Sequence, residues 1–392
     1  MNVFDILKER GFIHTVSHEK ELREALGKGP ITFYLGIDPT ADDLHIGHFF
    51  AVRVFSILQS FGHKGILLLG GATGQIGDPS DKNDMRKLMT TKIIDDNVAS
   101  IKNVLTRFIN LNKTTFVNNA DWTRNQSYLE FMQNVGTHFN VSDMLSKDCY
   151  KNRLGNGLTF FEMGYMLLQA YDFIHLNNTY GCTLQIGGTD QWSNILAGVE
   201  LGRKMSLENG KSRPAMMGLC NPLLTKSDGT KMGKTEKGAL WITPEKCSPY
   251  DFYQYFINVD DRDVEKLLKF FTMIPITEIT QMCKTDIIGA KKLMAFEITK
   301  LIHGEQIATQ QINANFTTGE NAPTETINTT DRNIVDVLSQ TSVISSKREA
   351  REFIQSGAIS INGERVDNVN TVLPDSFLLK KGKKTFIKIT LQ

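Results

Sequence analysis

The 392-residue sequence has only five cysteines, no long apolar run and almost no net charge. The cysteines are odd in number and lie at least 27 residues apart, which argues against a disulfide framework and against a zinc knuckle. No apolar run approaches the roughly 18 residues of a membrane-spanning helix, so no membrane association is expected. The 44 lysines and arginines nearly balance 43 aspartates and glutamates, and the net charge of +1 gives no argument for a nucleic-acid partner.

What is present is typical of a globular protein. Hydrophobic residues make up 41% of the chain, and its length predicts two or three domains. Asp5 and Glu9 interrupt the N-terminal apolar residues, which disfavours a secretory signal and an acid-poor transit peptide. We therefore expect a cytoplasmic protein.

The first part of the chain alternates strands with helices. Strands are predicted at 31–37, 65–70, 182–188 and within 215–224, and helices at 44–58 and 190–204. Strand-to-strand spacings of thirty-odd residues are typical of βαβ units, so residues 1–246 are predicted to form an α/β domain with a Rossmann-like parallel sheet. Residues 80–175 are predicted to be a mostly helical insertion.

The remainder is predicted to contain two smaller parts. Ser248 and Pro249 are typical of a helix start, and residues 247–315 are predicted to be an α-helical domain. The polar, Thr- and Asn-rich stretch 316–330 is predicted to be a linker. Residues 331–392 then form a small α+β domain.

A histidine pair opens the first predicted helix. His45 and His48 are three residues apart, directly after a strand and a turn, where unpaired N–H groups and the helix dipole favour phosphate. Gly47 leaves room for a flat base against the backbone. An ordinary helix surface can also carry such a pair, but the strand–turn–helix context favours a nucleotide site.

A second cationic motif lies farther along the chain. Lys231 and Lys234 are three residues apart, followed by Thr235, in a Gly-rich segment that could close on a polyphosphate. Alone, the pattern is more often a solvated loop. Together with the histidine pair, it favours a polyphosphate-binding loop over a solvated one.

The two motifs, HIGH at 45–48 and KMGKT at 231–235, resemble the signatures of class I aminoacyl-tRNA synthetases. Four longer stretches, 34–45, 70–79, 165–173 and 185–192, are similar to bacterial-type tyrosyl-tRNA synthetases. The resemblance spans the whole chain with its motifs in order.

The resemblance implies a role for each of several residues. Tyr165, Gln169 and Asp172 lie at i, i+4 and i+7 and so share one helix face. By resemblance, the tyrosine substrate is held by Tyr34, Asp78, Tyr165, Gln169, Asp172 and Gln191, with Tyr34 and Asp172 at the phenol hydroxyl. Asn119 is predicted to add to this pocket, and an ordinary turn asparagine is the alternative. ATP is bound by Asp38, Gly47, Asp190 and Lys234, and the reaction is promoted by Thr40, His45, His48, Lys231, Lys234 and Thr235. No metal-ligating residues are expected. Leu35, Ala51 and Met232 depart from the residues that many relatives carry, which bears on ATP affinity and loop kinetics.

The C-terminal part resembles an S4-type RNA-binding domain. Ser346 begins a predicted capping box, and Asn362-Gly363 predicts a hairpin. Lys347, Arg348 and Arg351 cluster on one side of the helix, and residues 331–392 carry a net charge of +3. A solvated basic helix is the alternative to RNA binding.

The implied reaction is activation of L-tyrosine with ATP and Mg²⁺, without a prosthetic group, followed by transfer of tyrosine to the terminal ribose of tRNA(Tyr). A homodimer is implied as well. Three alternatives stay open: a tryptophanyl enzyme, an RNA-binding or splicing protein derived from a synthetase, and a small-molecule adenylyltransferase.

Overall fold

The computed structural model describes residues 2–80, 89–208, 215–235, 238–317, 322, 324–382 and 385–392. Its contacts divide the chain into two compact units. The first comprises residues 1–247 and 260–287, and the second comprises residues 248–259 and 288–392. Within those described ranges, no helix combines the length and the apolar character needed to cross a bilayer.

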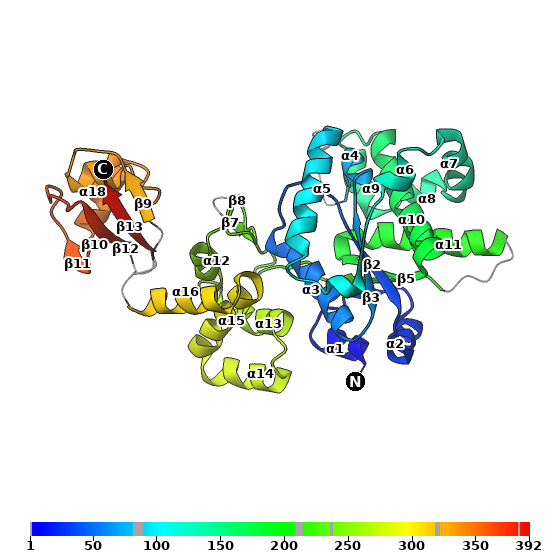
Figure 1. The fold of residues 1–392 in the computed structure, drawn as a ribbon, viewed down its shortest axis with the longest axis horizontal. Coiled ribbons are helices and arrows are strands. Elements are labelled where there is room, and N and C mark those ends of the chain that lie inside the picture. Colours follow the sequence, from blue (N-terminus) through cyan, green and yellow to red (C-terminus); the bar gives the residue numbers. More distant parts are fainter. Residues whose placement is uncertain are drawn as a thin grey trace. The chain divides into compact units, whose positions relative to one another are not determined.

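The first unit is built on a six-stranded sheet in the order β1-β6-β5-β2-β3-β4. The strands are β1 (Thr15–Val16), β2 (Thr32–Ile37), β3 (Lys64–Leu69), β4 (Thr114–Asn118), β5 (Cys182–Gly188) and β6 (Met217–Asn221). Neighbours run parallel, except that the two-residue β1 pairs antiparallel with β6. The predicted parallel sheet is therefore confirmed, and Figure 1 shows β2, β3 and β5 side by side.

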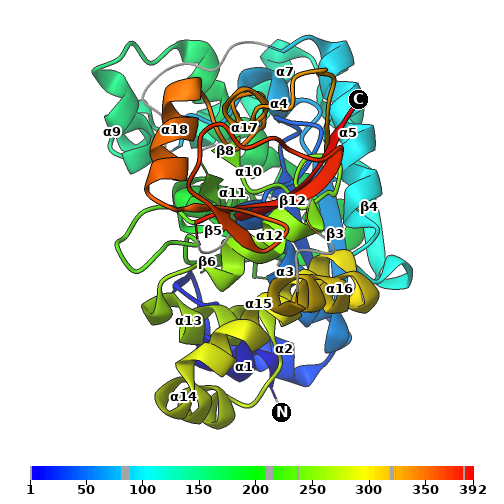
Figure 2. The same cartoon turned by 90° about the vertical axis from the view of Figure 1, so that its left-hand side faces the viewer.

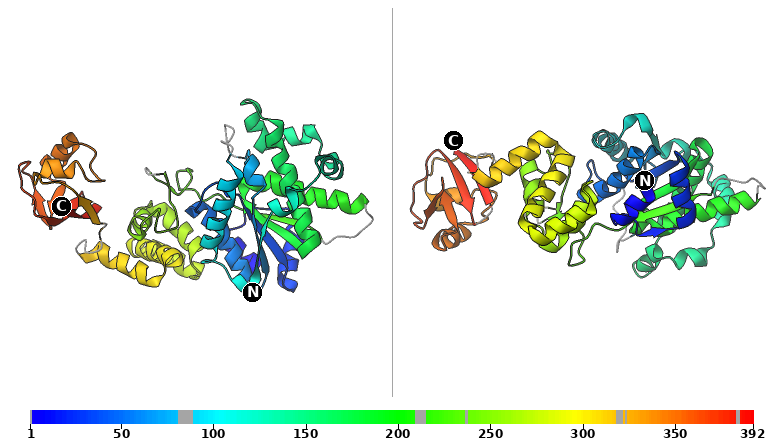
Figure 3. Two further views of the ribbon diagram at one scale, coloured as in Figure 1. Left: turned by 45° about the horizontal axis from the view of Figure 1, so that its top comes forward. Right: turned by 90° about the horizontal axis from the view of Figure 1, so that it is seen from below.

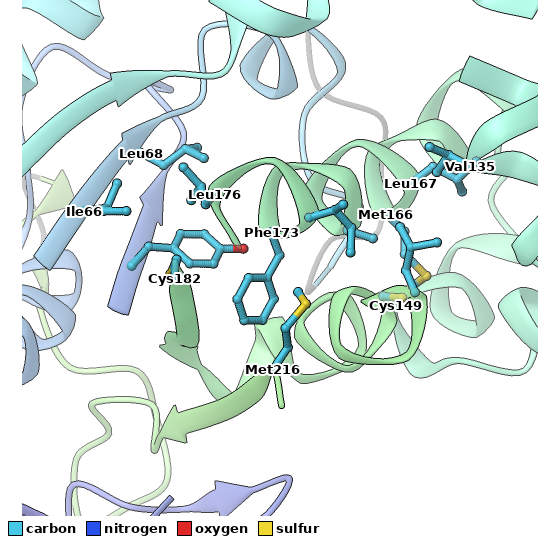
Figure 4. Close-up of a cluster of buried hydrophobic side chains, with 14 of the residues drawn as sticks. Ile66, Leu68, Val135, Cys149, Met166, Leu167, Phe173, Leu176, Cys182 and Met216 are labelled. Carbon is cyan, nitrogen blue, oxygen red and sulfur yellow. The ribbon is translucent and has the colours of Figure 1, made fainter. Parts of the chain in front are cut away.

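Helices cover both faces of the sheet. Consecutive strand residues point to opposite faces, and apolar residues of β2 pack against a different helix on each face. Phe33 of β2 packs against Phe55 of α3 (Ile46–Ser60), with ring centroids 4.9 Å apart. The next residue, Tyr34, packs against Phe173 of α10 (Phe160–Tyr180) at 5.2 Å. In Figure 4, Phe173 and Leu176 of α10 lie in one buried cluster with Leu68 of β3, on the face of the sheet that α10 covers.

The described residues of the predicted insertion at 80–175 are mostly helical, as predicted. It contains the helices α5 (Thr91–Leu105), α6 (Ala120–Thr123), α7 (Tyr128–Asn134), α8 (Val141–Leu145), α9 (Asp148–Leu154) and most of α10. It also contains β4, the edge strand beside β3, so the expectation of an insertion packed beside the sheet is wrong over 114–118. Residues 81–88 lie outside the described part of the chain.

The helical stretch after residue 247 divides between the two units. The first unit includes α13 (Asp261–Phe271) and α14 (Ile276–Thr285), besides α1 (Val3–Glu9), α2 (Glu19–Lys28), α4 (Thr73–Ile76) and α11 (Trp192–Glu208). Arg10 donates to the carbonyls of Lys269, Thr272 and Ile274 at 3.0, 2.9 and 2.7 Å, where α13 ends. This division differs from the predicted helical domain at 247–315.

The second unit contains α12 (Pro249–Ile257), α15 (Ile287–His303), α16 (Glu305–Thr317) and a small sheet. Ser248 caps α12 by accepting from the Asp251 amide, as predicted. The predicted linker at 316–330 is wrong in part, because α16 reaches Thr317 and residues 324–327 form a strand. Residues 318–321 and 323 lie outside the described part.

The small sheet has the order β11-β10-β12-β13-β9. Its strands are β9 (Thr324–Ile327), β10 (Ile359–Ile361), β11 (Glu364–Val366), β12 (Ser376–Lys381) and β13 (Thr385–Leu391), accompanied by α17 (Ile334–Leu338) and α18 (Lys347–Gln355). Figures 2 and 3 show this sheet with its helices in orange and red. Asn362 and Gly363 have φ angles of 48° and 90°, typical of the predicted hairpin turn. β13 separates β12 from β9 and pairs with β9 in parallel.

Candidate active site

A cavity of about 440 Å³ opens at the carboxyl ends of the parallel strands of the first unit. From β2 the chain proceeds through β3 to β4 on one side of the sheet, and later through β5 to β6 on the other. The strand order therefore reverses between β2 and β5, the place where open α/β sheets bind ligands. Asp38 follows β2 and Asp190 follows β5, and both line the cavity.

Most of the predicted site residues meet in this cavity. Its lining includes Tyr34, Asp38, Thr40, His45, Gly47, His48, Asp78, Tyr165, Gln169, Asp172, Asp190, Gln191 and Lys231. The three departures, Leu35, Ala51 and Met232, line it too. Asn119 is not among the lining residues, and the side chains of Lys234 and Thr235 lie outside the described part of the structure.

Asp172 lies at the buried end of the cavity. Its two carboxylate oxygens accept from Asn119 Nδ2 at 2.9 Å and from Trp122 Nε1 at 2.8 Å. Burial raises the pKa of Asp172 to about 7, and the two donors act in the opposite direction. The buried hydroxyl of Tyr34 has no hydrogen-bond partner. Burial, and the nearby Asp172 charge, raise its pKa, so it is a neutral group with an unused donor and acceptor.

Asn119 supports the Asp172 carboxylate by donating a hydrogen bond to it. Its side chain is fully buried, and besides Asp172 it donates to Thr73 Oγ1 at 3.0 Å. Its carbonyl oxygen accepts from the Ala72 amide at 2.7 Å. The expectation that Asn119 lines the tyrosine pocket is therefore replaced by a role in orienting Asp172.

Two further carboxylates form a polar wall. Asp38 accepts from the Tyr165 hydroxyl at 2.8 Å and from Thr73 Oγ1 at 2.7 Å. Asp78 accepts from Gln191, whose Oε1 in turn accepts from Gln169 Nε2 at 3.3 Å. Burial, with Asp38 close by, raises the pKa of Tyr165. An ammonium group only donates, so the carboxylate, hydroxyl and amide oxygens of this wall suit it as acceptors.

The histidines stack at the start of α3. Their ring centroids are 3.7 Å apart with an interplanar angle of 13°. His45 Nδ1 accepts from the His48 amide at 3.2 Å, which leaves Nε2 as the protonated nitrogen of a neutral ring. Burial lowers the pKa of His45, so this ring is neutral at pH 7. A Cβ on Gly47 would lie 3.0 Å from the His45 ring, so a larger residue here would require the ring to shift slightly.

The Lys231 segment forms a hairpin beside the cavity. Thr225 and Lys231 face each other across an antiparallel bridge, and the Met232 amide donates to the Leu224 carbonyl at 2.8 Å. Beyond Gly233, a short antiparallel pair, β7 (Lys234–Thr235) and β8 (Gly238–Ala239), leads to Trp241, which bridges to His45. The two predicted phosphate-binding motifs are thus joined through backbone pairing.

Asp190 is the fourth carboxylate of the cavity. Burial, and then the charge of Asp78, raise its pKa. Carboxylates alone do not make a metal centre here, because no group of three or more His, Cys, Asp or Glu side chains in the described ranges could hold a metal ion.

Sequence reasoning missed Trp122, Thr73 and Gln185. Trp122 orients Asp172, Thr73 joins Asp38 to Asn119, and Gln185 lines the cavity with a buried, unpartnered Oε1. Trp122 and Thr73 stand close to residues already singled out, but only the folded chain brings their polar atoms to the carboxylates. Their closeness in the sequence to predicted site residues was therefore only a weak indication of a role, and the contacts in the folded chain were needed to identify them.

The basic residues of α18 are exposed but mostly paired. Lys347 forms an ion pair with Asp336, and Arg348 forms one with Glu352 at 2.9 Å. Arg351 is exposed as well. The predicted capping box at Ser346 is only half formed, because Ser346 caps the Glu349 amide while Glu349 reaches back to the Ser345 amide.

Comparison with known proteins identifies the family. A model described as tRNA synthetases class I (W and Y) matches residues 26–317, and one described as tyrosine–tRNA ligase SYY-like C-terminal domain matches residues 312–389. The chain is 48% identical to a tyrosine–tRNA ligase of Fusobacterium nucleatum, covering 99% of this chain and 98% of that protein. It is 47% identical to one of Clostridium tetani, covering 100% and 99%.

Solved structures agree on the fold. A truncated mitochondrial tyrosyl-tRNA synthetase of Aspergillus nidulans superposes with a TM-score of 0.69 at 29% identity, covering 79% of this chain and 92% of that one. A tyrosyl-tRNA synthetase of Archaeoglobus fulgidus, complexed with L-tyrosine, gives 0.61 at 17% identity, covering 79% and 99%. The fold, the cavity and the full-length similarity lead to one conclusion: the chain belongs to the tyrosine–tRNA ligase family of class I aminoacyl-tRNA synthetases.

Proposed function

We propose that this protein activates L-tyrosine with ATP to form tyrosyl-adenylate and pyrophosphate, and then transfers tyrosine to the 3′-terminal ribose of tRNA(Tyr). The observation that carries the choice of amino acid is the presence of the unpartnered Tyr34 hydroxyl and the Asp172 carboxylate in the same buried part of the cavity. A phenol hydroxyl can donate to Asp172 and accept from Tyr34. An indole offers only a donor. Phenylalanine would offer neither, and so would leave the Tyr34 hydroxyl unpaired and Asp172 without a bond to the substrate.

The polar wall is assigned to the amino acid's ammonium group. Asp78, Tyr165 and Gln169 line the cavity together, and Gln191 connects Asp78 with Gln169. This arrangement would leave the substrate carboxylate toward the histidines. Asp190, beyond the end of β5, would bind the ribose of ATP, with Asp38 and Gly47 also on the nucleotide side.

Activation needs no protein nucleophile. The tyrosine carboxylate attacks the α-phosphorus of ATP, and pyrophosphate leaves with Mg²⁺ as part of the nucleotide substrate. Thr40, His45 and His48 would stabilise the developing charge from one side, and Lys231, Lys234 and Thr235 from the other. The protein would supply orientation and fixed dipoles, acting in the cytoplasm.

The proposal is tested by ATP–pyrophosphate exchange with each amino acid separately, followed by charging of total tRNA. Exchange should depend on tyrosine and not on tryptophan or phenylalanine. Exchange with tryptophan would favour the tryptophanyl alternative, and no exchange with any amino acid would favour an RNA-binding protein. Exchange without charging would favour an adenylyltransferase.

Lys347, Arg348 and Arg351 are proposed to contact tRNA from α18. The intramolecular partners of Lys347 and Arg348 are exposed ion pairs, which contribute little and can be exchanged for phosphate contacts. In the charging arm of the assay, reversing these three charges should therefore weaken charging and leave exchange unchanged.

A homodimer is proposed from an exposed apolar surface on the insertion. By this surface we mean the large exposed apolar side chains of α7 to α10, namely Tyr128, Leu129, Val141, Leu154, Phe160 and Phe161. They come from α7 to α10 of one unit, and so many large exposed apolar side chains in one region are typical of a protein interface. Each tRNA is proposed to lie across both subunits.

Replacing Phe160 with Glu is expected to produce monomers, because the change places a charge in an apolar contact. Phe160 is 70% exposed in the single chain, so the monomer itself should keep its fold. Sedimentation across a range of concentrations measures the result. Leu207→Glu is the matched control, since Leu207 is 71% exposed on α11 outside this surface. A Phe160→Glu protein that stays dimeric would refute the interface.

A further inference from the structure

The hairpin that carries Lys231 is anchored to a helix distant in the sequence. Lys266 of α13 donates from Nζ to the Thr225 carbonyl. Thr225 faces Lys231 across the antiparallel bridge. We call the hydrogen bond from Lys266 the anchor. It holds the Thr225 side of the hairpin, which pairs with the side that carries Lys231.

A buried acid fixes the Lys266 side chain. Asp263, one turn earlier on α13, forms an ion pair with Lys266 Nζ at 3.2 Å, and its side chain is only 2% exposed. The Lys266 side chain is about one third exposed. An acid buried in this way restricts the rotamers of its partner, because moving the ammonium away would leave the carboxylate without its countercharge.

The rest of the hairpin depends on local contacts. Asp228 accepts from the amide and hydroxyl of Thr230 at 2.9 and 2.6 Å, and the Lys226 amide donates to the Thr230 carbonyl at 2.8 Å. These contacts lie within the exposed tip, and Arg262 of α13 acts on Asp228 through its charge. On the far side, the Leu240 amide donates to the Gly233 carbonyl, and residues 240–242 pair with residues 44–46.

We propose that Lys266 is a positioning residue for amino-acid activation, which acts by fixing the base of the Lys231 hairpin. The hairpin is held at both ends, because Thr225 at one end is bonded to α13 and residues 240–242 beyond the other end pair with residues 44–46 at the start of α3. Lys231 then faces the nucleotide side of the cavity in a restricted range of positions. Loss of the anchor widens that range, and a catalytic group displaced by about 1 Å can lose roughly a hundredfold in rate.

The test is Lys266→Met, which keeps the length of the side chain and removes the donor. The inference rests on the proposed activation of tyrosine, so tyrosine-dependent exchange by the unaltered protein is measured first. The rate of adenylate formation at saturating substrates should fall roughly ten- to a hundredfold, while the dissociation constant of tyrosine changes less than about twofold. Lys266→Arg should restore most of the rate.

A double-mutant cycle distinguishes positioning from general destabilisation. In a Lys231→Met background, Lys266→Met should have little further effect on the rate, because its action passes through Lys231. Full additivity of the two changes would overturn the proposal, as would an unaltered rate in the single variant.

Two more variants protect the test against misfolding. Asp263→Asn with Lys266→Met removes the orphaned buried charge and should show the same slow activation. Lys269→Met is the matched control, because Lys269 lies one turn along α13 and pairs with Glu265 at 2.8 Å. Slow activation in the control, or normal activation in the Asp263→Asn/Lys266→Met protein, would contradict the assignment.

Discussion

Replacing Asp172 with Asn is expected to lower kcat/KM for tyrosine about a thousandfold and to leave the KM for ATP nearly unchanged. In the folded chain, Asp172 accepts from both Asn119 and Trp122. An asparagine has one acceptor oxygen, so its amino group would face one of these donors. A buried donor left unpaired costs about 1–3 kcal/mol, and a lost bond to a charged group costs about 1.5–3 kcal/mol. Together these losses amount to about three powers of ten.

Asp172 also predicts a pH dependence. Burial raises its pKa to about 7, so the carboxylate takes up a proton as the pH falls through that value. A protonated carboxyl is a weaker acceptor for a phenol hydroxyl, and the KM for tyrosine should therefore rise toward low pH, by at most about tenfold per pH unit. The Asp172→Asn protein should lose this dependence. The measurement is the initial rate of exchange from about pH 5.5 to about pH 8.5, a range that spans the pKa of Asp172.

Two outcomes would contradict the predictions for Asp172. A tyrosine KM that is flat with pH in the unaltered protein would show that Asp172 is not the acceptor of the phenol. An equal rise in the KM values for tyrosine and ATP in Asp172→Asn would indicate a distorted cavity. Trp122→Phe, which removes one donor and keeps the aromatic ring, should raise the tyrosine KM by a smaller factor.

Replacing His45 with Ala is expected to slow adenylate formation roughly a hundred- to a thousandfold, with tyrosine binding nearly unchanged. The neutral ring directs its Nε2–H away from the helix, because Nδ1 is occupied by the His48 amide. One preorganised donor to a developing negative charge contributes about this factor to the rate. Single-turnover adenylate formation and equilibrium tyrosine binding separate the two effects.

His45 also caps α3, and the cap must be distinguished from catalysis. The change to Ala removes a helix cap, which costs about 1 kcal/mol of stability. His45→Ser retains a capping oxygen without the ring, so it should be as slow as Ala but closer to the unaltered protein in thermal stability. His14→Ala is the control, since His14 is an exposed histidine whose ring Nδ1 is hydrogen-bonded to its neighbour Thr15. Equal loss of tyrosine binding and activation rate in His45→Ala would refute the role.

The parts of the fold that could be predicted share a strong local pattern. β2, α3 and β5 combine apolar runs with turns or caps, and the structure places them within a residue or two of their predicted bounds. β4 was missed because Thr114–Asn118 has mixed polarity and only half-buried side chains, as an edge strand allows. The extent of the linker was misjudged because β9 gains its partner, β13, only near the end of the chain.

The site shows the same division. Motif residues such as His45 and Tyr165 could be placed by pattern and resemblance, and they line the cavity. The supporting contacts could not be predicted, because they join residues far apart in the chain. Trp122 reaches Asp172 across 50 residues and Lys266 reaches Thr225 across 41, and neither pair has a local signature.

The position of β13 has a consequence for the synthesis of the protein. Because β13 lies between β12 and β9, the small sheet cannot close until residues 385–391 have left the ribosome. The six strands of the large sheet, by contrast, have all been made by Asn221. A nascent chain would therefore carry β9 without its only neighbour, an open edge to which other chains could add a strand. Pairing with β13, once that strand has emerged, protects this edge of β9.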